Sequence, residues 1–563
     1  MRATFEVQVF KTDHWVIETR CTSEEEARKL ARAVLSQPRS EGVRVLREWP
    51  KPDGTVVERE LFTEFREASN KITVGALEEA PRACETLDEF YAVDARLTVS
   101  RLFKGYIERL VVTPTEMLHN HVELRRLSEK DDLLPTAVSR VSVLQAGPDS
   151  KARRDEIYRI LGTMTERARQ AAALRDLPSV ARVGWTQAVE AAAALGPPED
   201  QDFLALTALS TESARVRSWP GKVEFYTDIL EREPELSGRP LTLLDGAVAD
   251  TLGVNPVVQE LLGAQPNLAQ ALGCLADLGQ GRLEAPPQGA SAATMRLNAL
   301  FGAHDMPASR HVMFDWMRRQ LRSAAPLVRN NPEGERGAFR ALLLRMMTDG
   351  GVLGGPPMAE ALTLRQMRFQ EAGGALGRKL AIDGVVATCQ DARLATLYLM
   401  ALAGSELGRE QAEHLNATLL GLVADTSAHG RFTSSGVTIK TNLERLTQLY
   451  QATVTSPLEP ELRDKVAEGI DGLIASYIVN QRVVERLDNP ADPLRHRAIR
   501  LMQMCTPGVL TSRKALAIVR ERVIGHLRQP NFEQKFVADI ADPAMRERAL
   551  RDFFTLLSRA GFH

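Results

Sequence analysis

The chain has 563 residues, several times the length of a typical domain of about 100–200 residues, so two to four domains are expected. Hydrophobic residues make up 44% and charged residues 26% of the chain, which excludes a wholly disordered, collagenous or mucin-like protein. The 71 Lys and Arg residues nearly balance the 73 Asp and Glu residues, so the net charge of -2 provides no global attraction to nucleic acid or to an acidic membrane.

The composition favours helices over a β-sandwich or a β-barrel. Aromatic residues make up only 5% of the chain, whereas Ala, Leu, Arg and Glu are abundant. Because the abundant residues are mostly strong helix formers, the sequence predicts a mainly α protein.

The cysteines and the apolar segments predict a cytoplasmic protein. The five cysteines form no close pair, which excludes a zinc knuckle or a CxxC motif and indicates a reducing compartment. Residues 1–20 lack the uninterrupted apolar stretch of a secretory signal. The most apolar segments, such as residues 395–404, fall far short of the ~20 residues that cross a bilayer, so no transmembrane insertion is expected.

The N-terminal 65 residues predict a small α/β module. Phe5, Val7 and Val9 alternate with polar residues and predict a strand, and a second strand follows a short polar break. Ser23 lies three residues before Glu26, and this spacing predicts a helix start with reciprocal capping. Two further extended runs follow, so the predicted order is ββαββ.

The role of this module has two interpretations. A module of about 60 residues buries proportionally little surface and is expected to dock on the rest of the chain as a structural cap. An exposed sheet face or edge can instead bind a partner, because an unpaired edge strand offers free amides and carbonyls for strand addition. The sequence leaves both interpretations open.

From about residue 66 the apolar period becomes helical. In residues 462–478 the apolar positions recur at spacings of three and four, which places them on one face of a helix. Near the C-terminus, Asp542 and Pro543 provide the cap and the first-turn proline of a last helix. Patterns of this kind predict roughly twenty helices.

Breaks in the helical pattern predict three parts. The Pro-, Gly- and Ala-rich residues 285–293 have no apolar period and predict a boundary between two helical lobes. The expected parts are an α/β module at 1–65, a first lobe at 66–284 and a second lobe at 294–563. No fixed repeat of ~30–45 residues is present, so the lobes are expected to be irregular, solenoid-like or bundle-like, arrangements of helices.

No motif supplies a nucleophile or a cofactor cradle. The glycine-rich residues 350–355 and 373–379 lack the Lys-Ser/Thr pair of a P-loop, and no GxSxG nucleophile motif occurs. Tight turns between helices explain both glycine-rich segments, with anion binding at a helix end near residues 377–379 as the alternative. The sequence therefore assigns no catalytic residue, no metal ligand and no cofactor.

His304 and Asp305, followed by His311, are the strongest hint of an enzyme. A His-Asp dipeptide serves as a pair of metal ligands in all-helical metal-dependent phosphohydrolases. Further His and Asp ligands are not evident in nearby helices, and the alternative is that Asp305 or Ser309 caps a helix.

Basic residues concentrate in residues 494–530. Eight Lys and Arg residues face one acid, Glu521, so 8 minus 1 gives a charge of about +7 in this window. Such a segment suits an acidic protein surface, an anionic lipid headgroup or a nucleic-acid backbone, unless acids elsewhere, such as those in residues 533–547, neutralise it. The absence of aromatic residues speaks against the stacking of single-stranded bases. The candidate binding residues are Arg495, Arg497, Arg500, Arg513, Lys514, Arg520 and Arg522.

These observations favour a non-enzymatic intracellular protein that acts as an interaction or regulatory scaffold. It is expected to bind other proteins through its helical surfaces and its N-terminal module. One alternative is a metal-dependent phosphohydrolase that uses His304, Asp305 and His311. The other is an anionic-partner protein that binds lipid or nucleic acid through residues 494–530. The partner and the oligomeric state do not follow from the sequence.

Overall fold

The protein is mainly α-helical. The structure is a computed structural model and describes residues 4–11, 14–35, 42–50, 56–65, 72–77, 79–130, 132–329, 331–370, 372–389, 391–506, 510 and 512–562. Within these ranges it contains thirty α-helices, one four-stranded sheet and a two-stranded hairpin. The predicted fold class, mainly α with a small N-terminal ββαββ module, is confirmed.

The helices outnumber the roughly twenty that apolar periodicity predicts. The excess comes from short helices such as α2 (Leu87–Tyr91), α22 (Glu406–Glu410) and α29 (Phe532–Phe536), each of 5 residues. Little more than one turn holds too few apolar residues to make a periodic stripe, so such helices leave no signal in the sequence.

The N-terminal module has the predicted element order. It consists of β1 (Thr4–Lys11), β2 (His14–Cys21), α1 (Glu24–Leu35), β3 (Gly42–Pro50) and β4 (Val56–Phe65). The strands lie in the order β2-β1-β3-β4, and all neighbours are antiparallel. The Glu26 backbone N–H donates to Ser23 Oγ across 3.3 Å at the start of α1, as the capping pattern predicts.

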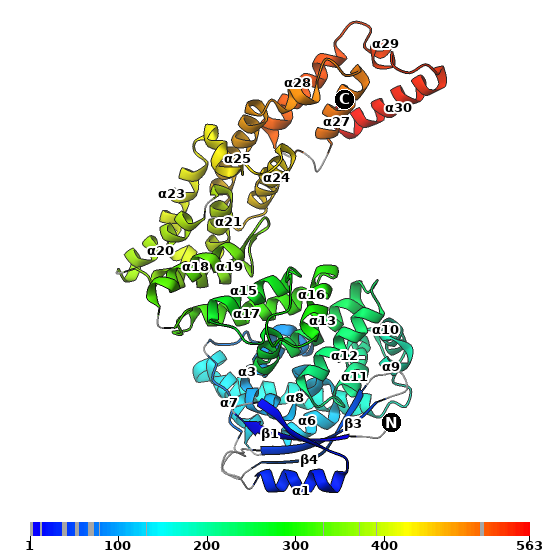
Figure 1. The fold of residues 1–563 in the computed structure, drawn as a ribbon, viewed down its shortest axis with the longest axis vertical. Coiled ribbons are helices and arrows are strands. Elements are labelled where there is room, and N and C mark those ends of the chain that lie inside the picture. Colours follow the sequence, from blue (N-terminus) through cyan, green and yellow to red (C-terminus); the bar gives the residue numbers. More distant parts are fainter. Residues whose placement is uncertain are drawn as a thin grey trace. The chain divides into compact units, whose positions relative to one another are not determined.

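One face of the sheet packs on α1. The alternation along β1 and β3 directs the apolar side chains to this face, and slipping a strand by one residue would expose them. The core between sheet and helix contains Phe5, Val7, Val9, Cys21, Ala27, Ala31, Val34, Val43 and Val45. Figure 1 shows α1 on this side of the sheet and the helices of the same unit on the other side.

The opposite face of the sheet is partly polar and also covered. Arg44 Nε donates to Gln8 Oε1 across 2.8 Å, and Gln8 Nε2 donates to Glu6 Oε2 across 2.9 Å, all three residues being buried. Trp15 Nε1 donates to the Arg109 carbonyl at 3.2 Å and so ties the sheet to the helices. With both faces covered, the edge strands β2 and β4 are the parts of the module at which strand addition would take place.

Contacts divide the chain into two compact units, Met1–Met317 and Arg318–His563. The helices of unit 1 that follow the sheet are α2, α3 (Val93–Leu102), α4 (Lys104–Leu110), α5 (Pro114–His119), α6 (His121–Ser128), α7 (Leu133–Ala146), α8 (Ser150–Ala172), α9 (Val180–Val183), α10 (Trp185–Ala193), α11 (Gln201–Ser213), α12 (Trp219–Arg232), α13 (Gly238–Leu252), α14 (Asn255–Leu262), α15 (Leu268–Gly279), α16 (Ala293–Ala303) and most of α17 (Pro307–Arg322).

Unit 2 contains the other helices and the hairpin. Its elements are α18 (Pro332–Met346), β5 (Met347–Thr348), β6 (Gly351–Val352), α19 (Gly355–Met367), α20 (Gly374–Thr388), α21 (Ala392–Ala403), α22, α23 (Ala412–Val423), α24 (Ile439–Val454), α25 (Pro460–Asn480), α26 (Val483–Leu487), α27 (Leu494–Met504), α28 (Arg513–Leu527), α29 and α30 (Pro543–Arg559). The helix predicted at residues 462–478 lies within α25, and Asp542 caps α30 as predicted.

The expected division into residues 1–65, 66–284 and 294–563 stays a prediction. Residues 285–293 run inside unit 1, where their backbone bonds to the end of α14. The Ala264 N–H donates to the Gln288 carbonyl across 2.8 Å, and the Ser291 N–H donates to the Glu260 carbonyl across 2.9 Å.

Candidate functional site

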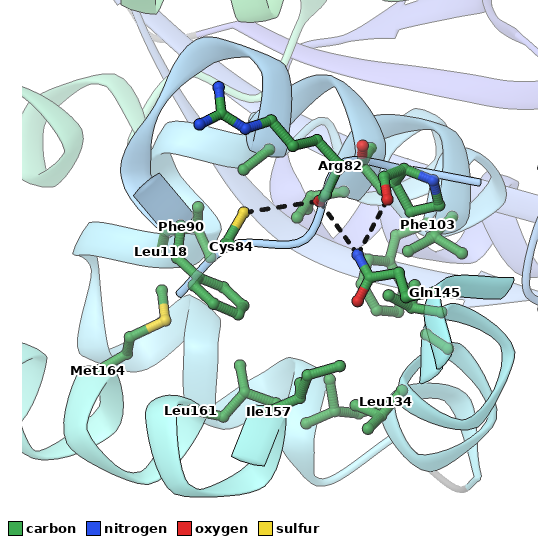
Figure 2. Close-up of a pocket in the computed structure, with 18 of the residues that line it drawn as sticks. Arg82, Cys84, Phe90, Phe103, Leu118, Leu134, Gln145, Ile157, Leu161 and Met164 are labelled. Carbon is green, nitrogen blue, oxygen red and sulfur yellow. Dashed lines mark hydrogen bonds between the residues drawn. The ribbon is translucent and has the colours of Figure 1, made fainter. Parts of the chain in front are cut away.

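An apolar cavity of about 110 Å³ lies inside unit 1, between α3, α7 and α8. Figure 2 shows Leu134, Ile157 and Leu161 on one side of it, with Arg82 and Cys84 on the opposite side. Its lining residues are Pro81, Arg82, Cys84, Phe90, Ala95, Thr98, Val99, Leu102, Phe103, Leu118, Leu134, Ala137, Val138, Val141, Gln145, Arg153, Ile157, Leu161 and Met164.

An extended segment, residues 79–86, closes one side of the cavity, and we call it the strap. Gln145 Nε2, from α7, donates to the carbonyls of Pro81 at 3.1 Å and Arg82 at 3.0 Å. Arg153 of α8 donates from Nη2 to the Cys84 carbonyl across 2.9 Å and from Nε to Gln145 Oε1 across 2.8 Å. The strap is therefore held through its backbone by side chains of two helices.

The size of the cavity is unusual for a protein interior. Cores are close-packed and contain few voids larger than a water molecule. The cavity is partly open, and the surrounding side chains leave about 110 Å³ of it unfilled. Filling it would therefore stabilise unit 1.

Cys84 lies at the strap side of the cavity. Its Sγ lies 3.6 Å from the Glu89 carbonyl and 4.0 Å from the Arg82 carbonyl. Burial raises the pKa of the Cys84 thiol, and the nearby Glu89 carboxylate raises it further. Because the thiolate is the nucleophilic form, this environment disfavours covalent catalysis by Cys84.

A second hollow lies in unit 2, and we call it the α28 groove. It has a volume of about 800 Å³ and is lined by Ile478, Val479, Val484, Glu485, Ala517, Ile518, Arg520, Glu521, Arg522, Ile524, Gly525 and Arg528. Val479 is 56% exposed, although it is apolar. A Cβ placed on Gly525 would meet no atom within 4 Å, so space is open above this part of α28.

Asp488 forms ion pairs with part of the predicted basic segment. Its carboxylate accepts hydrogen bonds from Arg497, Arg522 and His526, with 2.6 Å to Arg497 Nη2 and 2.7 Å to His526 Nε2, and its side chain is 0% exposed. Burial alone would raise the pKa of Asp488, but hydrogen bonds from Arg497 and Arg522 and the charge of His526 outweigh it and lower the pKa. Burial also lowers the pKa of His526.

The other candidate residues lie on α27 and α28, and most of them are paired. Arg495 pairs with Asp539 at 2.7 Å, Lys514 with Glu468 at 3.1 Å, and Arg500 with Asp492. Together with the Asp488 pairs, acids thus neutralise five of the seven candidates.

Two candidates remain without an acidic partner. Arg520 donates from Nη2 to the Ala560 carbonyl at 2.7 Å and lines the α28 groove. Arg513 is exposed, and no ion pair joins it to another residue in the described part of the chain. Whether these residues bind an anionic partner stays a prediction.

The residues of the possible metal site do not converge. Asp305 is 87% exposed and pairs with Arg310 at 2.7 Å, while His311 faces Asp94 at 3.4 Å. His304 is buried at the end of α16. Among the residues that the structure describes, no group of three or more His, Cys, Asp or Glu side chains is placed to hold a metal ion.

The cap of α17 comes from neither of the residues that the sequence offered, Asp305 or Ser309. The N–H groups of Ala308 and Ser309 donate to the Asp245 carboxylate of α13, at 2.7 and 3.0 Å. The two positions are more than 60 residues apart in the chain, so no local pattern could have shown this cap.

The glycine-rich segments form turns and helix starts. Residues 350–355 include β6, the second strand of the hairpin, and the first residue of α19, and α20 begins at Gly374. Arg378, one of the two basic residues of the possible anion site, pairs with Glu410 of α22.

The chain matches no protein family, no curated protein and no solved structure. In addition, none of the helices in the described ranges combines the length and apolar character of a membrane span. The function is therefore inferred from the two hollows and their surroundings.

Unit 1 contains a buried ion pair that the sequence analysis did not predict. Lys222 Nζ of α12 donates to the Glu116 carboxylate of α5, and both side chains are 0% exposed. Burial lowers the pKa of Lys222, while the Glu116 charge opposes this shift. The carboxylate also accepts hydrogen bonds from the Ser213 hydroxyl at 2.7 Å and the Thr113 N–H at 2.9 Å. With each oxygen partnered, the pair acts as a structural connection between helices.

His119 is a second buried ionisable group near this pair. Its ring packs against Tyr91 and Phe203, with centroids 4.9 and 5.1 Å away, and its Nδ1 lies 2.8 Å from the Thr115 carbonyl. Burial lowers the pKa of His119 to about 3, from an ordinary value of 6.5.

Unit 1 should lose stability on acidification because of His119. Between pH 6.5 and about 3 the unfolded chain binds a proton at this position that the folded chain does not. Each pH unit in this range lowers the free energy of unfolding by about 1.4 kcal/mol, so the loss is roughly 2 kcal/mol at pH 5. Urea unfolding at pH 7 and pH 5 measures this loss. His119→Phe, which keeps an aromatic ring, should show a smaller loss, and equal losses in both proteins would contradict the assignment.

Proposed function

We propose that the chain is a non-enzymatic interaction scaffold that binds a helical segment of another protein in the α28 groove. The single observation behind this proposal is the groove itself, a hollow with the exposed apolar Val479 on one wall and Ile518 and Ile524 on the other. Binding of a partner that covers such an apolar side chain is favourable, because it removes apolar surface from water.

The dimensions of the groove favour a helix as the occupant. The lining residues of α28 and its C-cap run from Ala517 to Arg528, about 16 Å along the helix axis. This length matches about three turns of a partner helix, whose apolar residues at spacings of three and four would face Val479 and Ile518.

The charges at the groove favour a protein over a polyanion. Arg520, Arg522 and Arg528 line it together with Glu485 and Glu521, so both signs are present, and Arg522 also pairs with Asp488. Acids beside the arginines repel phosphate groups, whereas a polypeptide can offer charges of both signs. The pairing of five candidate basic residues with acids supports the same choice, so lipid and nucleic acid are the less favoured partners.

The proposal includes a cytoplasmic location. The five cysteines are all free thiols in the structure, which fits a reducing compartment. In the proposal the N-terminal module acts mainly as a structural cap, because its two sheet faces are already covered.

Blocking the groove at Gly525 should abolish partner binding. A photo-crosslinking residue placed at Val479 in the full chain should form a covalent adduct with a partner protein in the native cell. Gly525→Trp should remove that adduct, because the indole fills the open space above α28. Gly525→Ala is the matched control, which should keep the adduct and raise the free energy of unfolding by roughly 0.5–1 kcal/mol.

Two results would overturn the proposal. One is a protein adduct of equal yield in the wild type and in Gly525→Trp. The other is crosslinking to nucleic acid or lipid in place of protein, which would move the function to the anionic-partner alternative.

A further inference from the structure

We propose that the cavity behind the strap binds the alkyl chain of a small amphiphile. The site lies in unit 1 and is independent of the α28 groove, so this inference does not rest on the proposed function. An apolar cavity of 150 Å³ in another protein admits benzene, and the cavity here, at about 110 Å³, falls in the same range.

Away from Arg82 and Cys84 at the strap, the polar side chains of the lining already bond to other groups of the protein. Thr98 Oγ1 donates to the Asp94 carbonyl at 3.2 Å, and both amide hydrogens of Gln145 are directed at strap carbonyls. Arg153 donates to Gln145, to Glu156 and to the Cys84 carbonyl. Apart from these residues and the strap, the interior is formed by aliphatic and aromatic side chains such as Val138 and Ile157. Burying a polar group without a hydrogen-bond partner is costly, so the interior selects an apolar group.

The strap side provides a place for the polar end of the ligand. Arg82 is 82% exposed and its guanidinium lies 3.3 Å from the partly exposed Glu89, a pair that contributes little to stability. A carboxylate at the end of an alkyl chain can therefore pair with the exposed Arg82 guanidinium. The strap is held by side-chain bonds to three of its carbonyls and by the Glu89 carboxylate, which accepts from the N–H groups of Glu85 and Thr86.

Cys84 serves as a reporter for occupancy. It is partly exposed at the cavity, whereas the other four cysteines of the chain are buried. A thiol-specific reagent should therefore modify Cys84 first. A bound ligand at ten times its Kd should slow this modification roughly tenfold, because only the unoccupied fraction reacts.

The experiment uses the full-length protein with hexanoate and 1-hexanol as probes. At a hundredfold excess over its Kd, a bound probe should raise the Tm of unit 1 by roughly 4 °C and protect Cys84. A larger shift with hexanoate, lost in Arg82→Ala, assigns the ligand to fatty acids. Equal shifts assign it to neutral alkyl compounds. No shift and no protection with either probe would overturn the proposal.

Variants that fill the cavity separate this site from surface binding. Ala137→Leu places three extra carbons in the cavity and should remove both the Tm shift and the protection of Cys84, while Ala172→Leu on the exposed side of α8 should keep both. Should Ala137→Leu misfold, Val141→Met fills the cavity from another position on α7. A Tm shift that persists in a folded, filled variant would overturn the proposal.

Discussion

Replacing Lys222 by methionine should lower the free energy of unfolding of unit 1 by about 3–5 kcal/mol. The substitution leaves the Glu116 carboxylate at 0% exposure without its counter-charge, and the hydrogen bonds from Ser213 and Thr113 compensate for only part of that loss. Hydrogen exchange of the amides in α5 and α12 measures the effect within unit 1, without contributions from unit 2.

The double variant Lys222→Met/Glu116→Gln distinguishes a charge effect from a packing effect. If the uncompensated charge is the cause, neutralising Glu116 should recover most of the lost stability. Arg125→Met is the surface control, because the Arg125–Glu129 pair is more than 60% exposed on both sides and should contribute less than about 1 kcal/mol. A loss with Lys222→Met as small as that of Arg125→Met would contradict the prediction.

Replacing Asp488 by alanine should destabilise the helices α26 to α28 by about 3 kcal/mol. The buried carboxylate joins Arg497 of α27 to Arg522 and His526 of α28, so its removal leaves two guanidinium groups and an imidazole facing one another. Arg522 is 50% exposed and can be hydrated again, which limits the loss.

Amide hydrogen exchange in α27 and α28 measures the loss at Asp488. Asp552→Ala is the matched control, since Asp552 pairs with Arg548 on the surface of α30 and is 74% exposed. The control should change stability by less than about 1 kcal/mol. Similar exchange rates in the two variants would show that Asp488 is not the connection between these helices.

Local patterns were the reliable part of the prediction. The alternation in β1, the Ser23–Glu26 cap and the Asp542 cap are each confirmed, because they depend on residues only a few positions apart. Short helices such as α22 were missed for the same reason, since 5 residues carry too little of a period to be seen.

The candidate sites depended on partners far away in the chain. The basic segment carries its excess of charge in the sequence, but Glu468, Asp488, Asp492 and Asp539 neutralise most of it in the fold. Only Asp539 lies in residues 533–547, the region from which the sequence led us to expect neutralising acids. The net charge of a sequence window therefore gives only the largest charge that its surface could carry. Ion pairs formed in the fold decide how much of that charge stays unpaired.

Neither hollow had a signal in the sequence. The cavity combines the strap with side chains of α2, α3, α5, α7 and α8, and the α28 groove combines three helices whose spacing is set by packing. A void forms where side chains from several helices fail to meet, and that depends on how the helices pack rather than on any one segment.

Fold class, helix faces and caps could be derived from the order of the residues, because hydrogen bonding and apolar period act over one or two helical turns. The Lys222–Glu116 pair spans 106 residues, and the Asp245 cap of α17 spans 64. Such contacts exist only after the helices have packed, since it is burial that makes an ion pair obligatory and it is imperfect packing that leaves a cavity. The candidate sites of this protein were accordingly decided by tertiary structure.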